Sequence, residues 1–569
     1  MNSGRDLEKL GDMLGDVFGR GVQAIERLDL VEIAVAERID HRVDRPFDLV
    51  KIAEQTVGVE TVATDHDRHT PAVLVWGFRG TGDRDRMGRE KIPLDRQFEH
   101  TGVLSQDLMS HKSPAPLMLS ISGARGIVGE SMTPAVALDF AAAFGSAVRA
   151  GGAPDNPTVC LGRDTRPSGG MLSAAAAAGL AAVGARVVDL GIVATPTVGV
   201  MVAERRAHGG MVITGSHNPA EWNGMKCIAS GGHAPSAQST AEILRRFGER
   251  DFILSLPREF VPRETDDRGS GLHVERVLAQ VDVESIRSAG LRVVLDSNNG
   301  AGGAAGRLLL EALGCEVIAV NDTPHGEFTH DPEPLADNMR QLAAETAAHD
   351  AVVGFGQDPD ADRLAIVDER GRYIGEEYTL VLAAQRVLDC RPPGPIAVNL
   401  STSRMIDDVA RRYSGAEVHR TPVGEANVVA EMKRCEAILG GEGNGGVILP
   451  SVCWIRDSLA AMALVLDLLA ASGHSLSTLV EQLPRYVMIK QKVDIPGGNG
   501  GSLTTRLTEH FAGARINSTD GVRADLDDGW VHVRPSNTEP VIRVIAEAQT
   551  QDRAQQLIDE AKEAIRRSH

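Results

Sequence analysis

The segment Thr214-Gly215-Ser216-His217-Asn218-Pro219 decides how this chain is interpreted. It follows the apolar run Gly210–Ile213, which is typical of a buried strand. The segment therefore lies at the carboxyl end of a strand, the edge where α/β proteins place their ligands. A hydrolase-type Ser–His pair is disfavoured, because adjacent side chains point apart and no Gly-x-Ser-x-Gly elbow is present. A plain turn with a satisfied serine and asparagine stays open at this point.

A second segment, Asp358-Pro359-Asp360-Ala361-Asp362-Arg363, has three carboxylates at alternate positions. They would repel one another unless a cation lay between them, and hard oxygen ligands suit Mg²⁺ or Ca²⁺. An EF-hand is disfavoured, because its sixth position needs glycine and here holds Arg363. The following residues, Leu364–Val367, also favour a strand instead of an EF-hand's exiting helix. A solvated acidic loop is the competing interpretation.

Two glycine- or proline-rich segments could bind phosphate and sugar. Arg534–Pro540 offers a guanidinium, two hydroxyls, an amide and turn N–H groups, a set that suits a phosphate dianion. In Gly440–Gly446 the glycines let the backbone approach a ligand, and Glu442 and Asn444 could receive sugar hydroxyls. Each segment alone is also compatible with an ordinary turn.

From Leu117 onward, strand-like runs alternate with Ala- and Leu-rich helical runs. This rhythm predicts mixed α/β layers with predominantly parallel sheets. The strand-like runs include Thr158–Leu161, Arg186–Leu190, Gly210–Thr214, Leu291–Asp296, Glu316–Val320, Ala351–Gly354, Leu364–Val367 and Ile396–Asn399, and the helical runs include Pro134–Arg149, Gly169–Val183 and Gly303–Leu313. The Pro and Gly content of Pro484–Pro496 further predicts a hinge there.

Composition excludes several classes of protein. With 569 residues the chain has room for about three or four domains. Aromatic residues make up only 4 %, so cores must be built from small aliphatic side chains and a base-stacking platform is disfavoured. The net charge of −19 would repel a nucleic-acid backbone over most of the surface.

Cysteine spacing and hydropathy favour a cytoplasmic protein. The six cysteines are widely spaced and form no C-x-x-C pair, which disfavours a zinc site or redox motif and favours reduced thiols. No run of 18 apolar residues predicts a spanning helix, and the N-terminus lacks a secretory pattern.

Taken together, these segments resemble the α-D-phosphohexomutase superfamily over about residues 118–569. Five or six matches in the family's order, at domain-scale spacing, make coincidence very improbable. The matching segments are Ser122–Gly129 (opening loop), Gly162–Arg166 (second loop), Thr214–Pro219 (phosphoserine loop), Asp358–Arg363 (metal loop), Glu442–Gly445 (sugar-recognition loop) and Arg534–Pro540 (phosphate-binding loop).

The resemblance implies an α/β fold of four domains around a central cleft. Three would be mixed α/β domains with largely parallel sheets, and the smaller C-terminal one would be α+β. The expected domains are 118–270 with the phosphoserine loop, 271–370 with the metal loop, 371–485 with the sugar-recognition loop and 486–569 with the phosphate-binding loop. Residues 1–117 have no counterpart in the family and are predicted to be a poorly ordered extension or the result of a start site placed too far upstream. A small regulatory or interaction domain is the alternative.

The resemblance also implies a reaction. A phosphoserine at Ser216 would exchange its phosphoryl group with a hexose phosphate, and a hexose 1,6-bisphosphate would turn over in the cleft before returning the other phosphate. Mg²⁺, held by this phosphate and by Asp358, Asp360 and Asp362, would neutralise the transferred oxygens. The remaining implied roles are acid/base and charge stabilisation (Lys226, Arg125), support of the phosphoryl site (Arg363, His217), binding of ring hydroxyls (Glu442, Asn444) and binding of the non-reacting phosphate (Arg534, Ser536, Asn537, Thr538).

Three loops bear on the choice of substrate. Glu442–Gly446 and Thr421–Asn427 resemble loops of phosphoglucosamine mutases, whereas Thr214–Pro219 is frequent in phosphomannomutase/phosphoglucomutase enzymes. Glucosamine phosphate is the favoured substrate and the second branch is the alternative, with a hexose 1,6-bisphosphate as activator. The expected partner is a small hexose phosphate, with no nucleic acid or membrane, and a homodimer is left open.

Three hypotheses come from other classes. A metal-dependent sugar phosphatase would share the aspartates and the phosphate loop without needing Ser216. A dinucleotide-dependent oxidoreductase rests on Gly300–Ala305, which loosely matches a nucleotide-binding fingerprint but better fits a helix start. A calcium-binding module rests on Asp358–Glu369.

Overall fold

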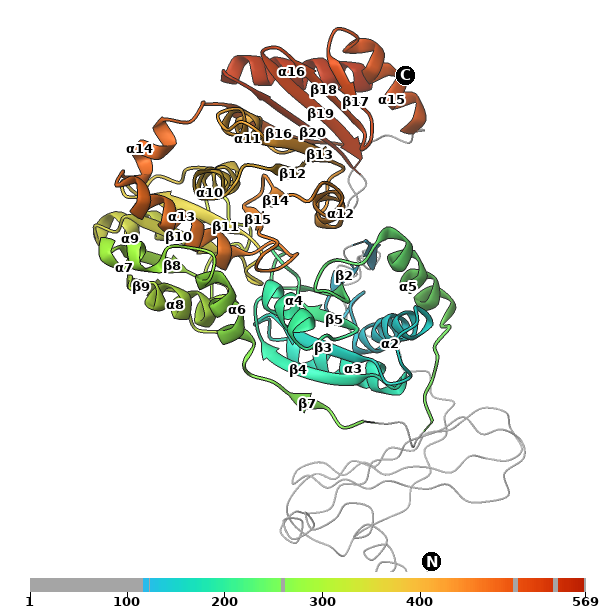
Figure 1. The fold of residues 1–569 in the computed structure, drawn as a ribbon. Helices are drawn as coiled ribbons and strands as arrows, with labels where there is room; N and C mark the ends of the chain where they lie inside the picture. Colours follow the sequence, from blue (N-terminus) through green and yellow to red (C-terminus); the bar gives the residue numbers. More distant parts are fainter. Residues whose placement is uncertain (1–115, 122, 257–260, 495–499, 536–540, 567–569) are drawn as a thin grey trace, which may run out of the picture. The chain divides into compact units, whose positions relative to one another are not determined.

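A computed structural model describes residues 116–121, 123–256, 261–494, 500–535 and 541–566. This part of the chain contains four β-sheets with helices packed against them (Figure 1). None of its helices has the length and apolar character needed to cross a membrane. Residues 1–115 of the predicted extension lie outside the described residues, as do Ser536, Asn537 and Thr538.

The first sheet has seven strands in the order β1-β2-β6-β5-β3-β4-β7. Strands β5, β3, β4 and β7 are parallel, and β6, β2 and β1 extend the sheet in antiparallel fashion. The strands are β1 (Met118–Ser120), β2 (Gly123–Ile127), β3 (Thr158–Arg163), β4 (Arg186–Ile192), β5 (Gly209–Ile213), β6 (Trp222–Ala229) and β7 (Glu264–Thr265). The helices are α2 (Pro134–Ala150), α3 (Gly169–Ala182), α4 (Thr195–Glu204) and α5 (Ala237–Glu249).

The second and third sheets share one plan: three parallel strands and one antiparallel edge strand. The second sheet has the order β11-β10-β8-β9 and the third β13-β12-β14-β15. The strands are β8 (Arg292–Asp296), β9 (Glu316–Val320), β10 (Val353–Gln357), β11 (Leu364–Asp368), β12 (Pro395–Asn399), β13 (Glu417–Thr421), β14 (Leu439–Glu442) and β15 (Gly446–Ile448). The helices are α6 (Gly269–Leu278), α7 (Val283–Ala289), α8 (Gly303–Ala312), α9 (Arg340–Ala348), α10 (Glu376–Cys390), α11 (Met405–Ala410), α12 (Glu425–Cys435), α13 (Ser458–Ser472) and α14 (Leu476–Glu481).

The fourth sheet is entirely antiparallel, in the order β16-β20-β19-β18-β17. Its strands are β16 (Val487–Asp494), β17 (Arg515–Asn517), β18 (Val522–Leu526), β19 (Gly529–Pro535) and β20 (Val541–Ala548), and its helices are α15 (Gly500–His510) and α16 (Gln551–Arg566). Helix α16 packs on β20, β19 and β16 (Figure 1). The predicted α/β fold with three mixed domains and an α+β C-terminal part is therefore confirmed.

The core is built from Leu, Val, Ile and Ala, as the scarcity of aromatic residues predicts. Small residues also let helices approach closely. A Cβ atom at Gly179 of α3 would lie 2.2 Å from the carbonyl oxygen of Leu138 in α2, so only glycine fits this crossing. One apolar cluster includes side chains from the first three sheets, whereas the fourth sheet and α16 form a cluster of their own.

Several predicted loops are wholly or partly strand. Gly123–Ile127, within the predicted opening loop, is strand β2, because it pairs with β1 on one side and β6 on the other. The Gly440–Gly446 segment is a β-hairpin between β14 and β15. Glycines have low strand propensity and hide such pairing in the sequence.

Most of the segment Pro484–Pro496, where a hinge is predicted, is strand, and the hinge itself stays a prediction. Residues Val487–Asp494 form strand β16, which pairs with β20 over all eight positions. The apolar start Val487–Ile489 and the β-branched Val493 favour a strand, and this preference outweighs the flanking prolines and glycines. The link between the third and fourth sheets is thus the short stretch between α14 and β16.

Candidate functional site

Ser216 follows β5 in the left-handed backbone region, with φ of +51°, and is completely buried. Its backbone N–H donates to Thr214 Oγ1 at 2.8 Å, and that hydroxyl donates to Asp164 Oδ2 at 2.7 Å. The Ser216 hydroxyl lies 3.3 Å from His217 Nδ1. A non-glycine residue held in this conformation costs about 1–3 kcal/mol, and such strain clusters at functional sites.

Arg166 holds the turn around Ser216 together. Its guanidinium donates to the carbonyl oxygens of Ser216 (2.7 Å), Asn218 (2.6 Å) and Pro219 (2.6 Å). It is fully buried and pairs with Asp164 at 3.2 Å. The sequence places Arg166 in a family loop but gives no signal of this role, because its partners on the turn are main-chain carbonyls.

The three aspartates of the metal loop connect β10 to β11 and are at most 1 % exposed. Their carboxylates lie within 4.8 Å of one another. One oxygen of each, Asp358 Oδ2, Asp360 Oδ1 and Asp362 Oδ1, lacks a hydrogen-bond partner among the described residues. Burial, followed by the charges of Asp362 and Asp360, raises the pKa of Asp358 well above its usual range. Free, buried, mutually repelling oxygens are the donor set that a hard divalent cation fits.

Lys226 connects this loop to the first sheet. From strand β6 its ammonium reaches Asp360 Oδ2 at 2.6 Å and Asp362 Oδ2 at 2.8 Å. Burial alone would lower the pKa of Lys226, but the two carboxylates outweigh burial and raise it. Thr195 adds a second link, since its hydroxyl donates to Asp360 Oδ2 at 2.5 Å. The ammonium thus neutralises the carboxylates, and its predicted acid/base role stays a prediction.

Arg125 and His217 lie beside the Ser216 turn. Arg125, on β2, donates to Asn218 Oδ1 at 3.3 Å. Burial, reinforced by the charges of Arg363 and Arg125, lowers the pKa of His217 well below its usual range. The imidazole is therefore neutral at pH 7. Arg363 closes the metal loop by donating its backbone N–H to Asp358 Oδ1 at 3.0 Å.

Glu442 and Asn444 differ in whether their side-chain oxygens are available to a ligand. Glu442 Oε1 accepts from Asn399 Nδ2 at 2.8 Å and from the Gly424 N–H at 3.0 Å, so this carboxylate is engaged by the protein. Asn444 Oδ1 is buried and lacks a partner within the described part of the chain. Asn444 is therefore the better placed of the two to receive a ligand hydroxyl.

Arg456 links two loops and is a residue that the sequence analysis misses. Its guanidinium donates to Asp362 Oδ2 and to Glu442 Oε2, each at 2.7 Å, and to Glu425 Oε2 at 3.2 Å. It joins the metal loop to the sugar-recognition loop while only 8 % exposed. No motif surrounds it in the sequence, and only its contacts with three distant carboxylates in the folded chain reveal it.

Arg534 is the second-last residue of strand β19 and is mostly buried, with its Nη1 donating to the Pro535 carbonyl at 3.0 Å. Its Nε lies 4.0 Å from Asp520 Oδ2. Burial lowers the pKa of Arg534, and the charge of Arg543 acts in the same direction. The phosphate-binding partners predicted next to it lie outside the described residues.

The glycine-rich turn after β8 supports the metal loop. The Ala301 N–H donates to the Pro359 carbonyl at 2.8 Å, and a Cβ atom at Gly300 would lie 2.7 Å from that oxygen. Helix α8 begins at Gly303, as the helix-start interpretation predicts. Pro359 fills the space over the turn, which argues against a bound dinucleotide. After the aspartates the chain continues as strand β11, which excludes the EF-hand.

Comparisons with known proteins agree with this geometry. Models of the phosphoglucomutase/phosphomannomutase domains match residues 118–253 (alpha/beta/alpha domain I), 272–371 (domain II), 375–486 (domain III) and 489–564 (C-terminal domain). A Methanopyrus kandleri protein named probable phosphoglucosamine mutase is 40 % identical, over 78 % of this chain and 97 % of that protein.

Two further relatives agree. A Thermococcus kodakarensis protein named phosphoglucomutase/phosphomannomutase is 37 % identical, over 77 % of this chain and 96 % of that protein. The crystal structure of a phosphoglucomutase/phosphomannomutase family protein from Burkholderia thailandensis superposes with a TM-score of 0.70 at 29 % identity, covering 79 % of this chain and 98 % of that one.

Proposed function

Because the chain belongs to the phosphoglucomutase/phosphomannomutase family, we propose that it interconverts the 6- and 1-phosphates of a hexose through a phosphoserine at Ser216. The meeting of two loops carries this proposal. Lys226 of β6, in the sheet that bears Ser216, and Thr195 at the start of α4 both bind Asp360 of the metal loop. A nucleophilic hydroxyl and a cation-binding carboxylate cluster thereby belong to one site.

The chain's own residues would divide the work. Asp358, Asp360 and Asp362 would hold Mg²⁺, which when bound neutralises charge on the transferred phosphoryl oxygens. Arg166 fixes the Ser216 turn. Arg125 and Lys226 would stabilise the charge of the phosphoryl group, and Lys226 would exchange a proton with the sugar hydroxyl.

Binding of the sugar phosphate would use the third and fourth sheets. Asn444 and Glu442 would receive ring hydroxyls, and Arg534 with the neighbouring Ser536, Asn537 and Thr538 would bind the phosphate that is not reacting. A hexose 1,6-bisphosphate would act as intermediate and activator. Its two phosphates could be exchanged only if the site held the sugar in two poses.

Glucosamine 6-phosphate is our proposed substrate. The Methanopyrus kandleri relative, named probable phosphoglucosamine mutase, supports this choice, and so do Asn444 and the glycines around it. The Thermococcus kodakarensis relative, named phosphoglucomutase/phosphomannomutase, makes glucose or mannose phosphate the second candidate.

A substrate panel tests both choices. The 1-phosphates of glucosamine, glucose and mannose are each assayed with Mg²⁺ and the matching 1,6-bisphosphate. The highest kcat/KM is expected with glucosamine 1-phosphate. A preference for glucose or mannose would select the second candidate, and no conversion of any member would overturn the proposal.

A serine variant separates a mutase from a phosphatase. Ser216→Ala is expected to abolish isomerisation and the phosphorylated species in intact-mass spectra, whereas Ser239→Ala on the exposed face of α5 leaves both unchanged. Metal-dependent hydrolysis that survives in Ser216→Ala, together with absent isomerisation in the wild type, would identify a phosphatase instead.

A further inference from the structure

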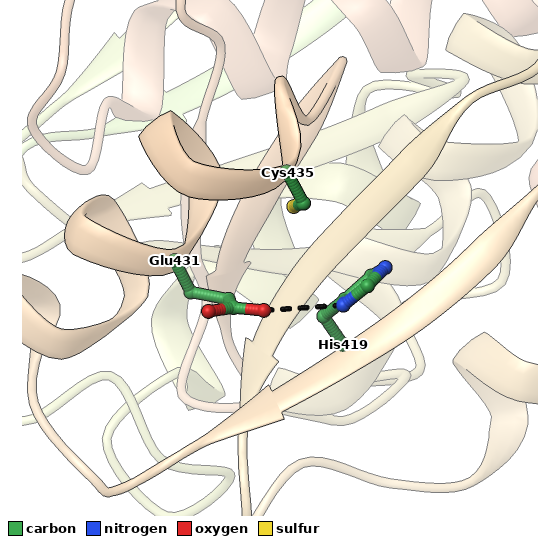
Figure 2. Close-up of side chains that lie close together, drawn as sticks. All are labelled: His419, Glu431 and Cys435. Carbon is green, nitrogen blue, oxygen red and sulfur yellow. Dashed lines mark ion pairs between the residues drawn. The ribbon is translucent and has the colours of Figure 1, made fainter.

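A second group of potential metal ligands lies outside the proposed catalytic site, between β13 and α12. His419 on the strand faces Glu431 and Cys435 on the helix (Figure 2). Glu431 and Cys435 are four residues apart and therefore share one face of the helix. One potential ligand atom of each of the three residues lies within 4.8 Å of those of the other two, and all three residues are partly buried.

The three donors form a mixed set. An imidazole nitrogen, a carboxylate oxygen and a thiol sulfur are the ligands that bind zinc in proteins. His419 Nδ1 lies 3.1 Å from Glu431 Oε1. Cys435 is not in a disulfide, so its sulfur is available as a ligand. Mg²⁺ by contrast selects oxygen ligands and suits the aspartates of the metal loop.

Arg434 shows that this position attracts a cation. Its Nη2 lies 2.5 Å from Glu431 Oε1 and 3.5 Å from His419 Nδ1, so the guanidinium sits against two of the three donors. The C-terminal end of α12 adds a negative potential from its free carbonyls. Because the Arg434 side chain is 65 % exposed, a metal ion could displace it with little loss of packing.

Of the two charged residues next to this group, Glu417 approaches the His419 imidazole and Lys433 does not. Glu417 Oε2 lies 3.7 Å from His419 Nε2, on the side of the ring away from Glu431. A carboxylate at the second ring nitrogen commonly orients a metal-binding histidine. Lys433 is directed elsewhere, with its ammonium 5.1 Å from the centre of the Trp454 ring.

We propose that His419, Glu431 and Cys435 bind a zinc-class divalent cation that displaces Arg434 and fastens α12 to β13. The absence of C-x-x-C pairs disfavours a zinc site made of closely spaced cysteines. It does not bear on a site whose ligands come from a strand and a helix far apart in the sequence. The site does not depend on the proposed mutase activity. The first turn of α12 holds Glu425, which binds Arg456, so the metal would steady a helix that contacts the proposed active site.

Cobalt(II) provides a direct probe, because a cysteine thiolate bound to it gives a charge-transfer absorption band in the near ultraviolet. The reduced full-length protein is titrated with Co²⁺ in excess Mg²⁺, which saturates oxygen-ligand sites. We expect the band in the wild type and in Cys390→Ser, which removes an exposed cysteine, and its loss in Cys435→Ser. No band in the wild type, or a band that survives in Cys435→Ser, would overturn the proposal.

Two more variants identify the other participants. His419→Asn should weaken Co²⁺ binding by about tenfold or more, since even a partner of a metal ligand is worth about 10–100-fold. Arg434→Gln should tighten it, because the competing guanidinium is gone. Unchanged affinity in His419→Asn, or weaker affinity in Arg434→Gln, would show that the cation binds elsewhere. Zn²⁺ should displace Co²⁺ and abolish the band.

Discussion

At the scale of single residues, Arg456 connects three segments of the proposed active site. It is buried among three carboxylates, and each of them belongs to a different segment: the metal loop, the sugar-recognition loop and α12. Removing one partner of a buried charge network costs about 3–5 kcal/mol, because the charges left behind have lost their solvent. Arg456 therefore positions Asp362 and Glu442 relative to each other.

We expect Arg456→Gln to lower kcat/KM by about 100-fold or more, since 1.4 kcal/mol corresponds to about tenfold. Arg456→Lys should recover little, because an ammonium lacks the planar fork that reaches three carboxylates. Mg²⁺ affinity by calorimetry should not weaken, because Asp362 loses a competing positive charge. The loss of kcat/KM should therefore arise mainly from a higher KM for the sugar phosphate.

A matched control is Arg386→Gln, which breaks a largely buried pair with Asp467 at 2.8 Å between α10 and α13. This variant should lose stability but keep kcat/KM within a few-fold. Equal losses of kcat/KM in both variants would show that Arg456 acts through the stability of the fold and not by positioning Asp362 and Glu442.

Glu377 is a second residue whose environment leads to a prediction. It is buried at the start of α10, and its Oε2 accepts the Ser403 N–H at 2.9 Å. Burial is the main cause that raises its pKa to about 8. Between pH 4.5 and 8 the folded state therefore binds more protons than the unfolded state, and stability falls as the pH rises.

Glu377→Gln keeps the acceptor and removes the titration. The variant should gain stability over the wild type as the pH rises, by about 4 kcal/mol near pH 8. Unfolding temperatures measured from pH 5 to 8.5 check this, with the exposed Glu284→Gln as control. A difference that stays constant with pH would contradict the prediction.

At the scale of elements, the positions of the chemistry were easier to predict than the elements around it. Ser216 follows a predicted strand and the three aspartates precede one, because apolar runs followed by polar loops are local signals. Strand β2 and strand β14 of the Glu442 hairpin contain glycines that pair with strands far along the chain, β6 and β12. Arg166 and Arg456 bind groups from segments far along the chain, which no local pattern encodes.

The turn that carries Ser216 depends on Gly215. A Cβ atom there would lie 2.7 Å from Cζ of Arg166, whose guanidinium holds the carbonyls of the turn. Overpacking of this kind costs about 1–3 kcal/mol. Gly215→Ala should therefore lower kcat by about 10- to 100-fold and reduce phosphoserine formation measured by intact mass.

Gly170→Ala is the control, since a Cβ atom at Gly170 meets nothing within 4 Å. It should leave kcat and phosphorylation unchanged. Normal phosphorylation in Gly215→Ala would contradict the prediction, because it would mean that the Arg166 side chain can shift without displacing Ser216.

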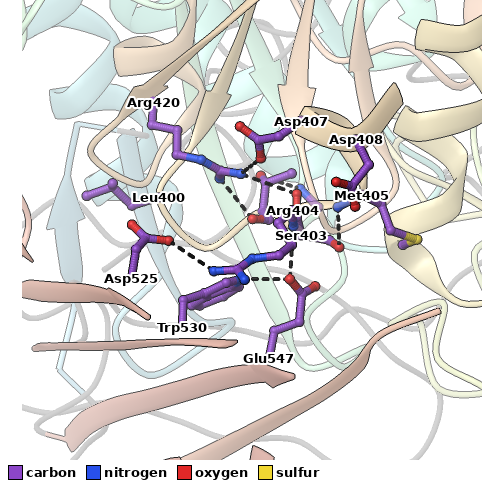
Figure 3. Close-up of polar contacts among 12 residues, drawn as sticks. Leu400, Ser403, Arg404, Met405, Asp407, Asp408, Arg420, Asp525, Trp530 and Glu547 are labelled. Carbon is purple, nitrogen blue, oxygen red and sulfur yellow. Dashed lines mark hydrogen bonds and ion pairs between the residues drawn. The ribbon is translucent and has the colours of Figure 1, made fainter. Parts of the chain in front are cut away.

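At the scale of the whole molecule, apolar packing unites the first three sheets, whereas the fourth sheet has a separate core. Many of the contacts between the third and fourth sheets are polar (Figure 3). The Arg404 N–H donates to Glu547 Oε1 at 2.9 Å, which also accepts from Trp530 Nε1 at 2.7 Å. Polar interfaces of this kind permit relative motion of domains.

His532 makes this interface sensitive to pH. Its Nδ1 lies 2.9 Å from the hydroxyl of Ser401, next to the third sheet, and its Nε2 lies 2.7 Å from the Asp520 carbonyl. Since a carbonyl can only accept, Nε2 carries the proton and Nδ1 accepts from Ser401. Burial is the main cause that lowers the pKa of His532 to about 4.

The unfolded state, with an ordinary histidine pKa of 6.5, therefore binds more protons than the folded state between pH 4 and 6.5. The stabilisation by neutral His532 is complete above pH 6.5 and is lost as the pH falls through 4, amounting to about 3 kcal/mol. We expect the amides of β18 and β19 to exchange with deuterium more readily at pH 5 than at pH 7, after correction for intrinsic rates.

In His532→Gln this pH dependence should shrink, whereas the exposed His474→Gln should behave like the wild type. An equal pH response in His532→Gln and the wild type would place the sensitivity in other groups, and would leave His532 as a structural contact alone.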